Sequence, residues 1–381
     1  MIDLDRVAPP SRPAPPSARV LPAALVVVLM SVFLIGPSAP MPEIRDLPEV
    51  AATAVPSGTW LLTGTTLYST HAGTTGQLGV TAWSLESGAA LWQRELDWFA
   101  GLPALAQAGP ALVVSGNDDA RILDARTGED RVDPGTYSVA RPAGDRVALW
   151  DGAAGMLTLF DPAAGRAVWR RELVDRPHAV AATDDHLLVV TDIGATVLTL
   201  AGGELVDVTS KAVAAGGAPV VKVIDGRVYL LGDNSLTMIP PADVRTMWTT
   251  PLLLPRTAVP CGAHVCVSGG PGLAAFDPDT GRLAWADVNW IGGENGVVRT
   301  ADGRALQIDP DRGAVRRDLG RGLPAGDLLI RADGDGLSVV EWATGLVRGR
   351  VPGATPSGCR RTGEHLACQQ VGGQVRVWEL L

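Results

Sequence analysis

Four cysteines are the most distinctive reactive side chains in the sequence, and they occur as two local pairs, Cys261 with Cys266 and Cys359 with Cys368. A two-residue turn at Gly363-Glu364 would place Cys359 opposite Cys368, where cross-strand Cβ atoms lie about 4.5–5.5 Å apart, close to bridging distance. Neither pair has the C-x-x-C spacing of redox and zinc sites. Both pairs are therefore predicted to be disulfides within hairpins, in a protein that faces an oxidising compartment.

The histidines and the acidic clusters form no recognisable catalytic or metal-binding pattern. His186, His264 and His365 each begin a strand at a place where other repeats have Arg, which indicates a structural role. Asp118-Asp119 and Asp333-Gly334-Asp335-Gly336 resemble fragments of calcium loops but lack the full set of ligating positions. Nucleophile elbows, phosphate-binding loops and dinucleotide fingerprints are absent from the sequence. No catalytic, cofactor-binding or metal-binding residue is predicted, and the chain is not expected to be an enzyme.

Composition favours a β-rich fold and argues against nucleic-acid binding. The chain has 381 residues, 46% of them apolar, with 45 Gly and 29 Pro scattered along its length. Such scatter is typical of many short strands joined by tight turns. The net charge is −9 and no basic run occurs. An acidic surface of this kind repels the phosphate backbone.

The N-terminal segment is predicted to be a membrane signal-anchor. Residues 1–19 carry three arginines and five prolines, and the uncharged stretch 20–42 is long enough to cross a hydrocarbon core of about 30 Å as a helix. Pro40 obstructs the nearest cleavage site, although a cleaved signal peptide remains the alternative. The arginines place residues 1–19 in the cytoplasm and the rest of the chain on the extracytoplasmic side. Residues 43–58 then form a Pro-rich spacer.

A repeat with a period of about 37 residues organises residues 59–381. Each copy has an apolar strand, an acidic residue, a short turn and a Gly, followed four residues later in the best copies by Trp. The glycines are Gly88, Gly128, Gly165, Gly281, Gly313 and Gly345, and two degenerate copies end at Gly203 and Val244. Acidic residues of these turns include Asp124, Asp161, Asp277 and Asp309. The tryptophans are Trp92, Trp169, Trp248 and Trp285, whereas Val132, Asp207, Arg317 and Gly349 stand at that position in other copies.

The physical chemistry of the repeat predicts hairpins. The Asp side chain can accept hydrogen bonds from backbone N–H groups two residues further on, and Gly supplies the positive φ that the loop needs. A second apolar strand precedes each copy, for example at residues 146–150 and 227–231. Two hairpins per unit make a four-stranded meander, the size of one propeller blade. A single meander cannot bury both faces, so neighbouring units are expected to pack face to face.

The sequence resembles the pyrroloquinoline-quinone-like (PQQ-like) repeat family, whose signature is a strand ending in an aliphatic-Asp-x-x-Thr-Gly turn followed by x-x-x-Trp. The resemblance covers roughly residues 59–381. It implies a β-propeller, usually eight-bladed, in which the Trp docks between adjacent blades. Nine copies of the repeat can be counted, but the seventh and eighth units are short. About eight four-stranded blades are therefore expected, within a range of seven to nine.

The end of the chain predicts how the propeller closes. Residues 374–381 form a ninth strand of the repeat type with no strand after it. An open propeller would leave unpaired strand edges, which invite association with other chains. The segment 43–58 is the piece of chain available to complete that blade, and Pro48 suits an outermost edge. The two ends of the propeller are expected to meet in one blade.

The resemblance implies a non-catalytic binding or scaffolding module for a protein partner in the cell envelope, because a propeller of this family serves as a docking platform in the outer-membrane assembly machinery. Two alternatives stay open. One is a sensor that binds a small envelope ligand and works with a membrane partner. The other is a quinoprotein dehydrogenase, which would need a catalytic Asp, calcium ligands and, in many members, an adjacent Cys pair that this sequence lacks. No cofactor is predicted.

Overall fold

The computed structural model describes residues 45–380, except 55–58, 74–75, 98–102, 117–118, 134–135, 174, 210–219, 241–246, 295, 334–335, 353–355 and 371–372. Residues 45–381 form one compact unit. The tail at residues 1–19 and the anchor predicted at 20–42 lie outside the described residues. Among the residues that are described, no helix is long and apolar enough to cross a membrane.

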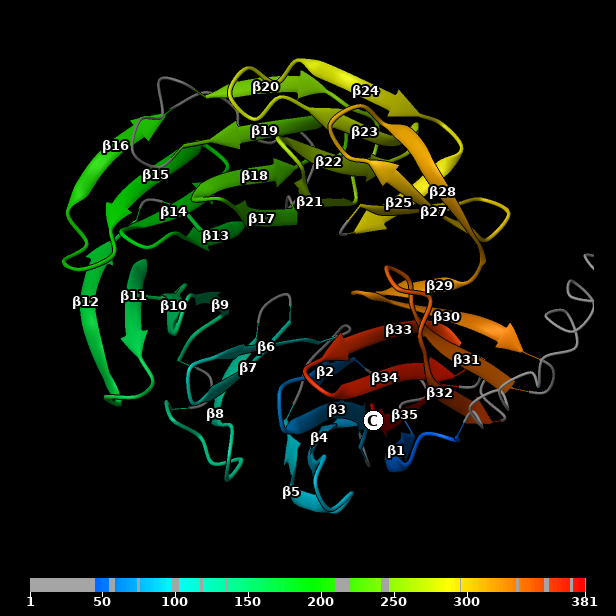
Figure 1. Ribbon diagram of the computed structural model, residues 1–381. Helices are drawn as coiled ribbons and strands as arrows, with labels where there is room; N and C mark the ends of the chain where they lie inside the picture. Colours follow the sequence, from blue (N-terminus) through cyan, green and yellow to red (C-terminus); the bar gives the residue numbers. More distant parts are fainter. Residues whose placement is uncertain are drawn as a thin grey trace, which may run out of the picture. The chain divides into compact units, whose positions relative to one another are not determined.

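The predicted all-β propeller is confirmed, and the described residues form nine antiparallel sheets, or blades, in chain order (Figure 1). Blade 1 consists of β2 (Trp60–Leu62), β3 (Thr66–Ala72), β4 (Leu78–Ser84) and β5 (Ala90–Leu96). Blade 2 consists of β6 (Ala104–Ala108), β7 (Ala111–Ser115) and β8 (Ala120–Asp124). Blade 3 consists of β9 (Val139–Ala143), β10 (Arg146–Asp151), β11 (Met156–Asp161) and β12 (Arg166–Glu172). Blade 4 consists of β13 (Ala179–Ala182), β14 (His186–Thr191), β15 (Gly194–Thr199) and β16 (Leu205–Thr209). Blade 5 consists of β17 (Val220–Ile224), β18 (Arg227–Leu231), β19 (Ser235–Ile239) and β20 (Trp248–Pro251). Blade 6 consists of β21 (Thr257–Cys261), β22 (His264–Gly269), β23 (Gly272–Phe276) and β24 (Leu283–Asp287). Blade 7 consists of β25 (Trp290–Glu294), β26 (Val297–Thr300), β27 (Arg304–Asp309) and β28 (Ala314–Arg321). Blade 8 consists of β29 (Leu323–Ala325), β30 (Leu328–Asp333), β31 (Gly336–Glu341) and β32 (Val347–Pro352). Blade 9 consists of β33 (Pro356–Thr362), β34 (His365–Gln370), β35 (Gln374–Glu379) and β1 (Glu49–Ala54).

Nine blades, rather than the favoured eight, is a correction within the predicted range. The two short units that argued for eight are complete four-stranded sheets, β25 to β28 and β29 to β32. Their connections are shorter, with Gly322 alone between β28 and β29. Blade 2, in contrast, is smaller than expected. Among its described residues only three strands are present, and an isolated bridge between Leu123 and Asp130 stands in place of the fourth.

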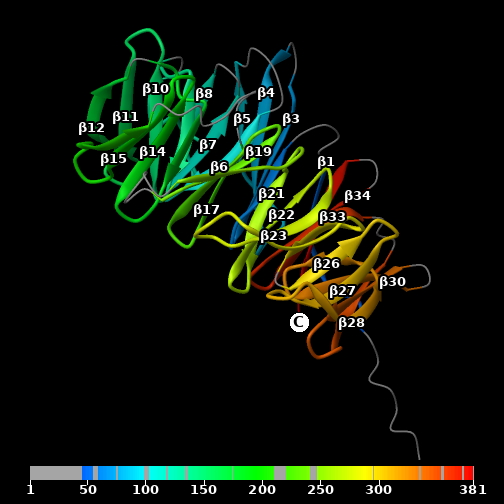
Figure 2. The ribbon, with the colours of Figure 1, turned by 90° about the horizontal axis from the view of Figure 1, so that it is seen from above.

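The first and last described strands meet in blade 9, where β1 forms the outer strand beside β35 (Figures 1 and 2). The ladder pairs Ala51 with Val377 and Thr53 with Val375. Arg376 Nε donates to Glu49 Oε2 at 2.9 Å across the same pair of strands. The strand lies within residues 43–58, the segment from which the sequence suggested a closing strand. The compact unit therefore begins at residue 45 rather than at residue 59.

Nine clusters of buried apolar side chains join the described blades, and each cluster is shared by two consecutive blades. Blades 9 and 1 share the cluster that contains Leu67 and Val377. The smallest cluster joins blades 7 and 8 and contains Val297, Ala305, Leu319 and Leu329. Because each sheet buries one face against each neighbour, the hydrophobic core is a series of interfaces around the unit.

Candidate functional site

The repeat turns have the hydrogen bonds that the sequence predicts. Asp277 Oδ1 accepts from the backbone N–H groups of Asp279 at 3.0 Å and Thr280 at 2.8 Å. The Gly281 N–H donates to the Asp277 carbonyl at 2.9 Å, and Gly281 has φ of +67°. Hydrogen bonds from the Thr280 hydroxyl and backbone N–H lower the pKa of Asp277. The ionised carboxylate is thus part of the turn.

Each repeat Trp lies on the repeat Gly of the following blade. A Cβ on Gly281 would lie 2.5 Å from Trp248 Cδ2. The same relation holds at three other junctions, with Gly128 against Trp92, Gly203 against Trp169 and Gly313 against Trp285. These four glycines therefore meet two requirements, a positive φ and close approach of an indole.

The indole nitrogens of these tryptophans bind one recurring backbone acceptor. Each Nε1–H donates to the carbonyl of the residue that follows the acidic position in the next blade. The pairs are Trp92 with Ala125 at 3.1 Å, Trp169 with Leu200 at 3.2 Å, Trp248 with Pro278 at 3.0 Å and Trp285 with Pro310 at 2.9 Å. The Trp residue thus joins two blades by packing and by a directional bond.

Arginine supplies the bond at two junctions that lack Trp. Arg131, beside Val132, donates to the Pro162 carbonyl and to Asp124 Oδ2. Arg317 stands at the Trp position itself and donates to the Trp342 carbonyl. Arg131 lies one residue before the position at which the repeat has Trp, and the repeat pattern therefore missed it.

At the junction of blades 8 and 9, the residues that precede β1 take the place of the repeat Trp. Gly349 occupies the Trp position, and a Cβ there would clash with the Leu47 side chain. Leu47 N–H donates to the Arg350 carbonyl at 2.8 Å, and Arg350 N–H donates to the Arg45 carbonyl at 2.9 Å. The missing Trp is therefore explained by Leu47, which is 4% exposed.

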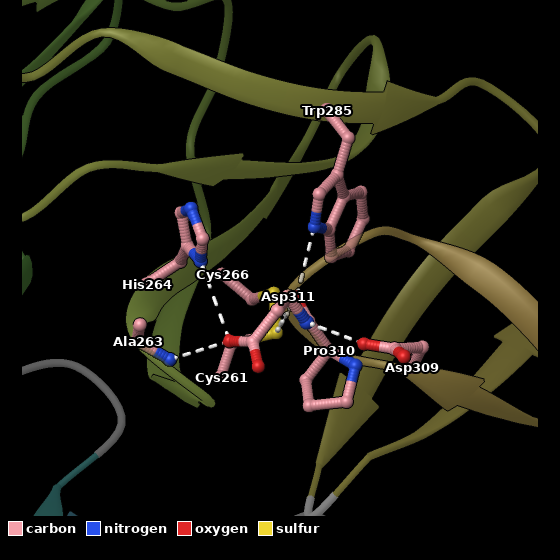
Figure 3. Close-up of a disulfide and its surroundings, with 8 residues drawn as sticks. All are labelled: Cys261, Ala263, His264, Cys266, Trp285, Asp309, Pro310 and Asp311. Carbon is pink, nitrogen blue, oxygen red and sulfur yellow. Dashed lines mark hydrogen bonds and ion pairs between the residues drawn. A yellow bond between two sulfur atoms is a disulfide. The ribbon is translucent and has the colours of Figure 1, made fainter.

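Both predicted disulfides are present in the structure. The Cys261–Cys266 bridge lies in the β21–β22 hairpin beside the repeat turn of blade 7 (Figure 3). Asp311 Oδ1 of that turn accepts from the Ala263 N–H at 2.7 Å and lies 3.7 Å from His264 Nδ1. The bridge therefore supports a blade junction.

The second bridge follows the predicted register. Cys359 pairs directly with Cys368, and Thr362 pairs with His365 at the turn. Cys368 is 1% exposed and belongs to the cluster between blades 8 and 9.

The histidines lie apart from one another along the blades. His178 Nε2 lies 2.8 Å from Asp192 Oδ1, and His186 pairs with Thr199 in a strand ladder. Of the acidic clusters, Asp333 accepts from the Ser338 hydroxyl at 2.6 Å and Asp119 lies 3.2 Å from Arg121. Asp118, Gly334 and Asp335 lie outside the described residues.

The described side chains do not fit the quinone site of a dehydrogenase. In the described part of the chain, no three His, Cys, Asp or Glu side chains gather where a metal ion could be held. The four cysteines are held in two hairpin bridges rather than in an adjacent pair. We therefore derive no step through a bound quinone.

Exposed leucines and a valine define an apolar face on the loops of blades 5, 6 and 7. This apolar face consists of Leu253, Leu254, Gly270, Pro271 and Val288. Leu253, Leu254 and Val288 are 55%, 49% and 74% exposed. A Cβ on Gly270 would lie 3.3 Å from Leu253 Cγ, and one on Gly272 would lie 2.7 Å from Val288 Cα. Both side chains therefore adjoin the β22–β23 turn.

The loop that carries the two leucines is held by backbone hydrogen bonds. Leu254 N–H donates to the Asp233 carbonyl at 2.8 Å, and the Gly270 N–H donates to the Leu253 carbonyl at 2.9 Å. Leu254 has φ of +46°, a conformation that a leucine rarely adopts. The Pro-Leu-Leu-Leu-Pro run at residues 251–255 is the sequence signal for this face, and it lies outside the repeat pattern.

A small pocket lies where the first strands of blades 7, 8 and 9 approach one another. Its volume is about 270 Å³, and it is lined by Ile291, Glu294, Arg299, Leu323 and Cys359 among others. Arg299 Nε is buried and has no hydrogen-bond partner among the described residues. The lining thus combines apolar side chains with one cation, Arg299, and one carboxylate, Glu294.

The fold and its repeat turns define a β-propeller of PQQ-like repeats. A family model described as outer membrane protein assembly factor BamB matches residues 153–318. BamB from Moraxella catarrhalis is 17% identical, with a TM-score of 0.51, and the match covers 88% of this chain and all of that one. The computationally designed Ika8 protein is 12% identical, with a TM-score of 0.48, covering 88% and 98% of the two chains. No curated protein matches the sequence.

Proposed function

We propose that the protein is a non-catalytic docking scaffold of the cell envelope, in which the propeller binds a protein partner on the extracytoplasmic side of the membrane. Residues 20–42 anchor it, and residues 1–19 form a short cytoplasmic tail. The observation that carries the proposal is the apolar face, in which Leu253, Leu254 and Val288 are exposed and Leu253 and Val288 both adjoin the β22–β23 turn. Contiguous exposed apolar side chains on a rigid support are typical of protein interaction sites.

Backbone conformation favours docking over a purely structural role for this face. A leucine at positive φ costs about 1–2 kcal/mol relative to the ordinary helical region. About half of Leu254 remains exposed, so further apolar area is available for burial against a partner. Burial against a partner would recover that cost, because apolar area removed from water stabilises the complex.

Two features support the envelope location. Both cysteine pairs form disulfides, which persist in oxidising compartments. The matching family model carries the description of an outer membrane assembly factor.

Site-specific photocrosslinking in intact cells tests the docking proposal. A photoreactive phenylalanine analogue replaces Leu253 or Val288, and the control replaces Val315, which is 52% exposed on the outer strand of blade 7. We expect one discrete protein adduct from the first two positions and none from the control. Adducts that are the same at all three positions, or absent at all three, would contradict docking through this face. Sequencing the N-terminus of the membrane-bound protein tests the uncleaved anchor separately.

A ligand-binding sensor is the second candidate, and the pocket beside Arg299 favours it. The pocket would take a small ligand whose carboxylate or phosphate pairs with Arg299 and whose hydrogen-bond donor faces Glu294, with Ile291 and Leu323 as apolar contacts. A screen of anionic metabolites by thermal shift, with Arg299→Gln as the comparison, separates this candidate from docking. The Leu253 and Val288 crosslinks are expected to be unaffected by Arg299→Gln.

A further inference from the structure

The junction of blades 2 and 3 lacks the indole that fills four other junctions. Val132 stands at the Trp position, four residues after Gly128. No atom of the described residues lies within 4 Å of the point that a Cβ on Gly165 would occupy, whereas the nearest described atom is 2.5 Å away at Gly281. Gly165 has φ of +65°, close to the value at the occupied junctions. The turn at Gly165 therefore has the same backbone conformation as at the other junctions, but no described Trp packs on it.

A groove of about 470 Å³ lies at this junction. Phe160 and Thr158 of β11 line it together with Gly165, and Tyr137 lines it from the blade 2 side. Phe160 corresponds to Phe276 in blade 6, whose cluster includes the packed Trp248. Phe160 itself is 6% exposed, and Val132 and Tyr137 pack against its cluster. The open part of the groove is therefore the repeat turn at Gly165, the position that an indole covers at other junctions.

The missing outer strand of blade 2 accompanies the missing side chain. The described chain after β8 makes a single bridge, between Leu123 and Asp130, whereas the other eight blades have a full fourth strand. An extended segment from another protein could supply both the aromatic side chain and the chain direction that this blade lacks.

Charge at the rim indicates which segment would bind. Arg166 and Arg170 line the groove from β12, and both are exposed. No hydrogen bond or ion pair of either guanidinium occurs among the described residues. Asp133 is the acidic group of the lining. Two cations against one anion favour an acidic ligand, and arginine pairs well with carboxylates.

We propose that this groove binds an extended acidic segment of a protein partner by seating one aromatic side chain, preferably Trp, on the repeat turn at Gly165. Carboxylates on either side of the aromatic residue pair with Arg166 and Arg170. The site is separate from the apolar face, so the inference does not rest on the proposed docking at Leu253 and Val288.

Binding of short synthetic peptides to the full-length protein tests the inference. The probe is acetyl-Asp-Trp-Asp-amide with 5-fluorotryptophan, followed by ¹⁹F NMR. Unlabelled Asp-Trp-Asp and the comparison peptides, which carry Ala in place of Trp or Lys in place of Asp, are each measured by their displacement of this probe. We expect the Asp-Trp-Asp peptide to bind at least tenfold more tightly than either comparison. Equal binding of the three peptides, or no binding of any, would overturn the proposal.

Filling the groove from within the chain gives the sharpest variant. Val132→Trp restores the repeat and should seat its own indole on Gly165, raising Tm and abolishing peptide binding. Peptide binding that is unchanged in a Val132→Trp protein with raised Tm would contradict the site.

Charge reversal keeps the inference testable if Val132→Trp folds poorly, because both arginines are exposed. Arg166→Glu with Arg170→Glu should reverse the preference toward the Lys-Trp-Lys peptide. Arg282→Ala is the matched control, since Arg282 follows Gly281 as Arg166 follows Gly165, at a junction that Trp248 occupies. The control should bind as the wild type does. An unreversed preference in the double variant, or equal loss in the control, would refute the assignment.

Discussion

Gly281 lies directly against Trp248 across the boundary of blades 5 and 6, so that a Cβ on the glycine would be 2.5 Å from the indole Cδ2. The same indole donates to the Pro278 carbonyl at 3.0 Å. The glycine of one repeat and the tryptophan of the preceding repeat are therefore a single packing unit, although 33 positions of sequence separate them.

Alanine at two repeat glycines separates backbone strain from packing. Gly165→Ala should cost about 1 kcal/mol, because its φ is positive but its surroundings are open. Gly281→Ala should cost a further ~1–3 kcal/mol, since the methyl group must displace the indole. Urea denaturation of both variants measures the difference. Equal losses would mean that Trp248 does not restrict the position.

Acid should weaken the repeat turns. The Thr280 hydroxyl and backbone N–H lower the pKa of Asp277, and a hydrogen bond from Arg316 does the same for Asp309. A pKa lowered by folding stabilises the protein above the unfolded value of about 3.9, and this contribution is lost as pH falls through the folded value.

We therefore expect Asp277→Asn to flatten the loss of unfolding free energy between about pH 5 and pH 3. Thr280→Val keeps the carboxyl but removes its hydroxyl donor, and should give an intermediate slope. Denaturation curves at several pH values provide the measurement. An unaltered slope in Asp277→Asn would show that this turn does not contribute to acid sensitivity.

The repeat turns could be predicted from sequence because each is encoded by adjacent residues, such as Asp277, Thr280 and Gly281. The blade count was harder, since two units look short and blade 9 takes its outer strand from the other end of the chain. Leu47 filling the space at Gly349 could not be predicted, because no local pattern links residues about 300 positions apart. The apolar face was missed for a related reason: Leu253 and Val288 are distant in sequence and adjoin the same turn, Leu253 at Gly270 and Val288 at Gly272.

Removing the Cys359–Cys368 bridge should destabilise the propeller without changing its fold. The bridge closes a short loop, with a sequence separation of 9, which corresponds to about 2–3 kcal/mol in the chain-entropy model. Paired Cys359→Ala and Cys368→Ala substitutions should lower the unfolding free energy by this amount. The pair Cys261→Ala and Cys266→Ala provides the comparison at another junction. Free thiols in the unreduced wild-type protein would contradict both bridges.

Deleting β1 should open blade 9. Removal of Glu49–Ala54 exposes the edge of β35 and takes Ala51 out of the cluster that joins blades 9 and 1. We expect a chain that begins at residue 55 to melt well below one that begins at residue 49, and to associate through the exposed edge. Both chains lack Leu47, so the difference reports β1 alone. Calorimetry and analytical ultracentrifugation of the two chains provide the test. A Tm within a degree or two, with both chains monomeric, would show that closure does not depend on β1.

The pairing of β1 with β35 also sets an order in time for biosynthesis. β1 emerges among the first strands of the propeller and β35 is its last described strand, and Glu49 and Arg376 are 327 positions apart. Blades 1 to 8 can assemble as they leave the ribosome or the export channel, but blade 9 cannot. A product that stops before β35 would keep β1 unpaired, so closure of blade 9 requires synthesis to continue through β35.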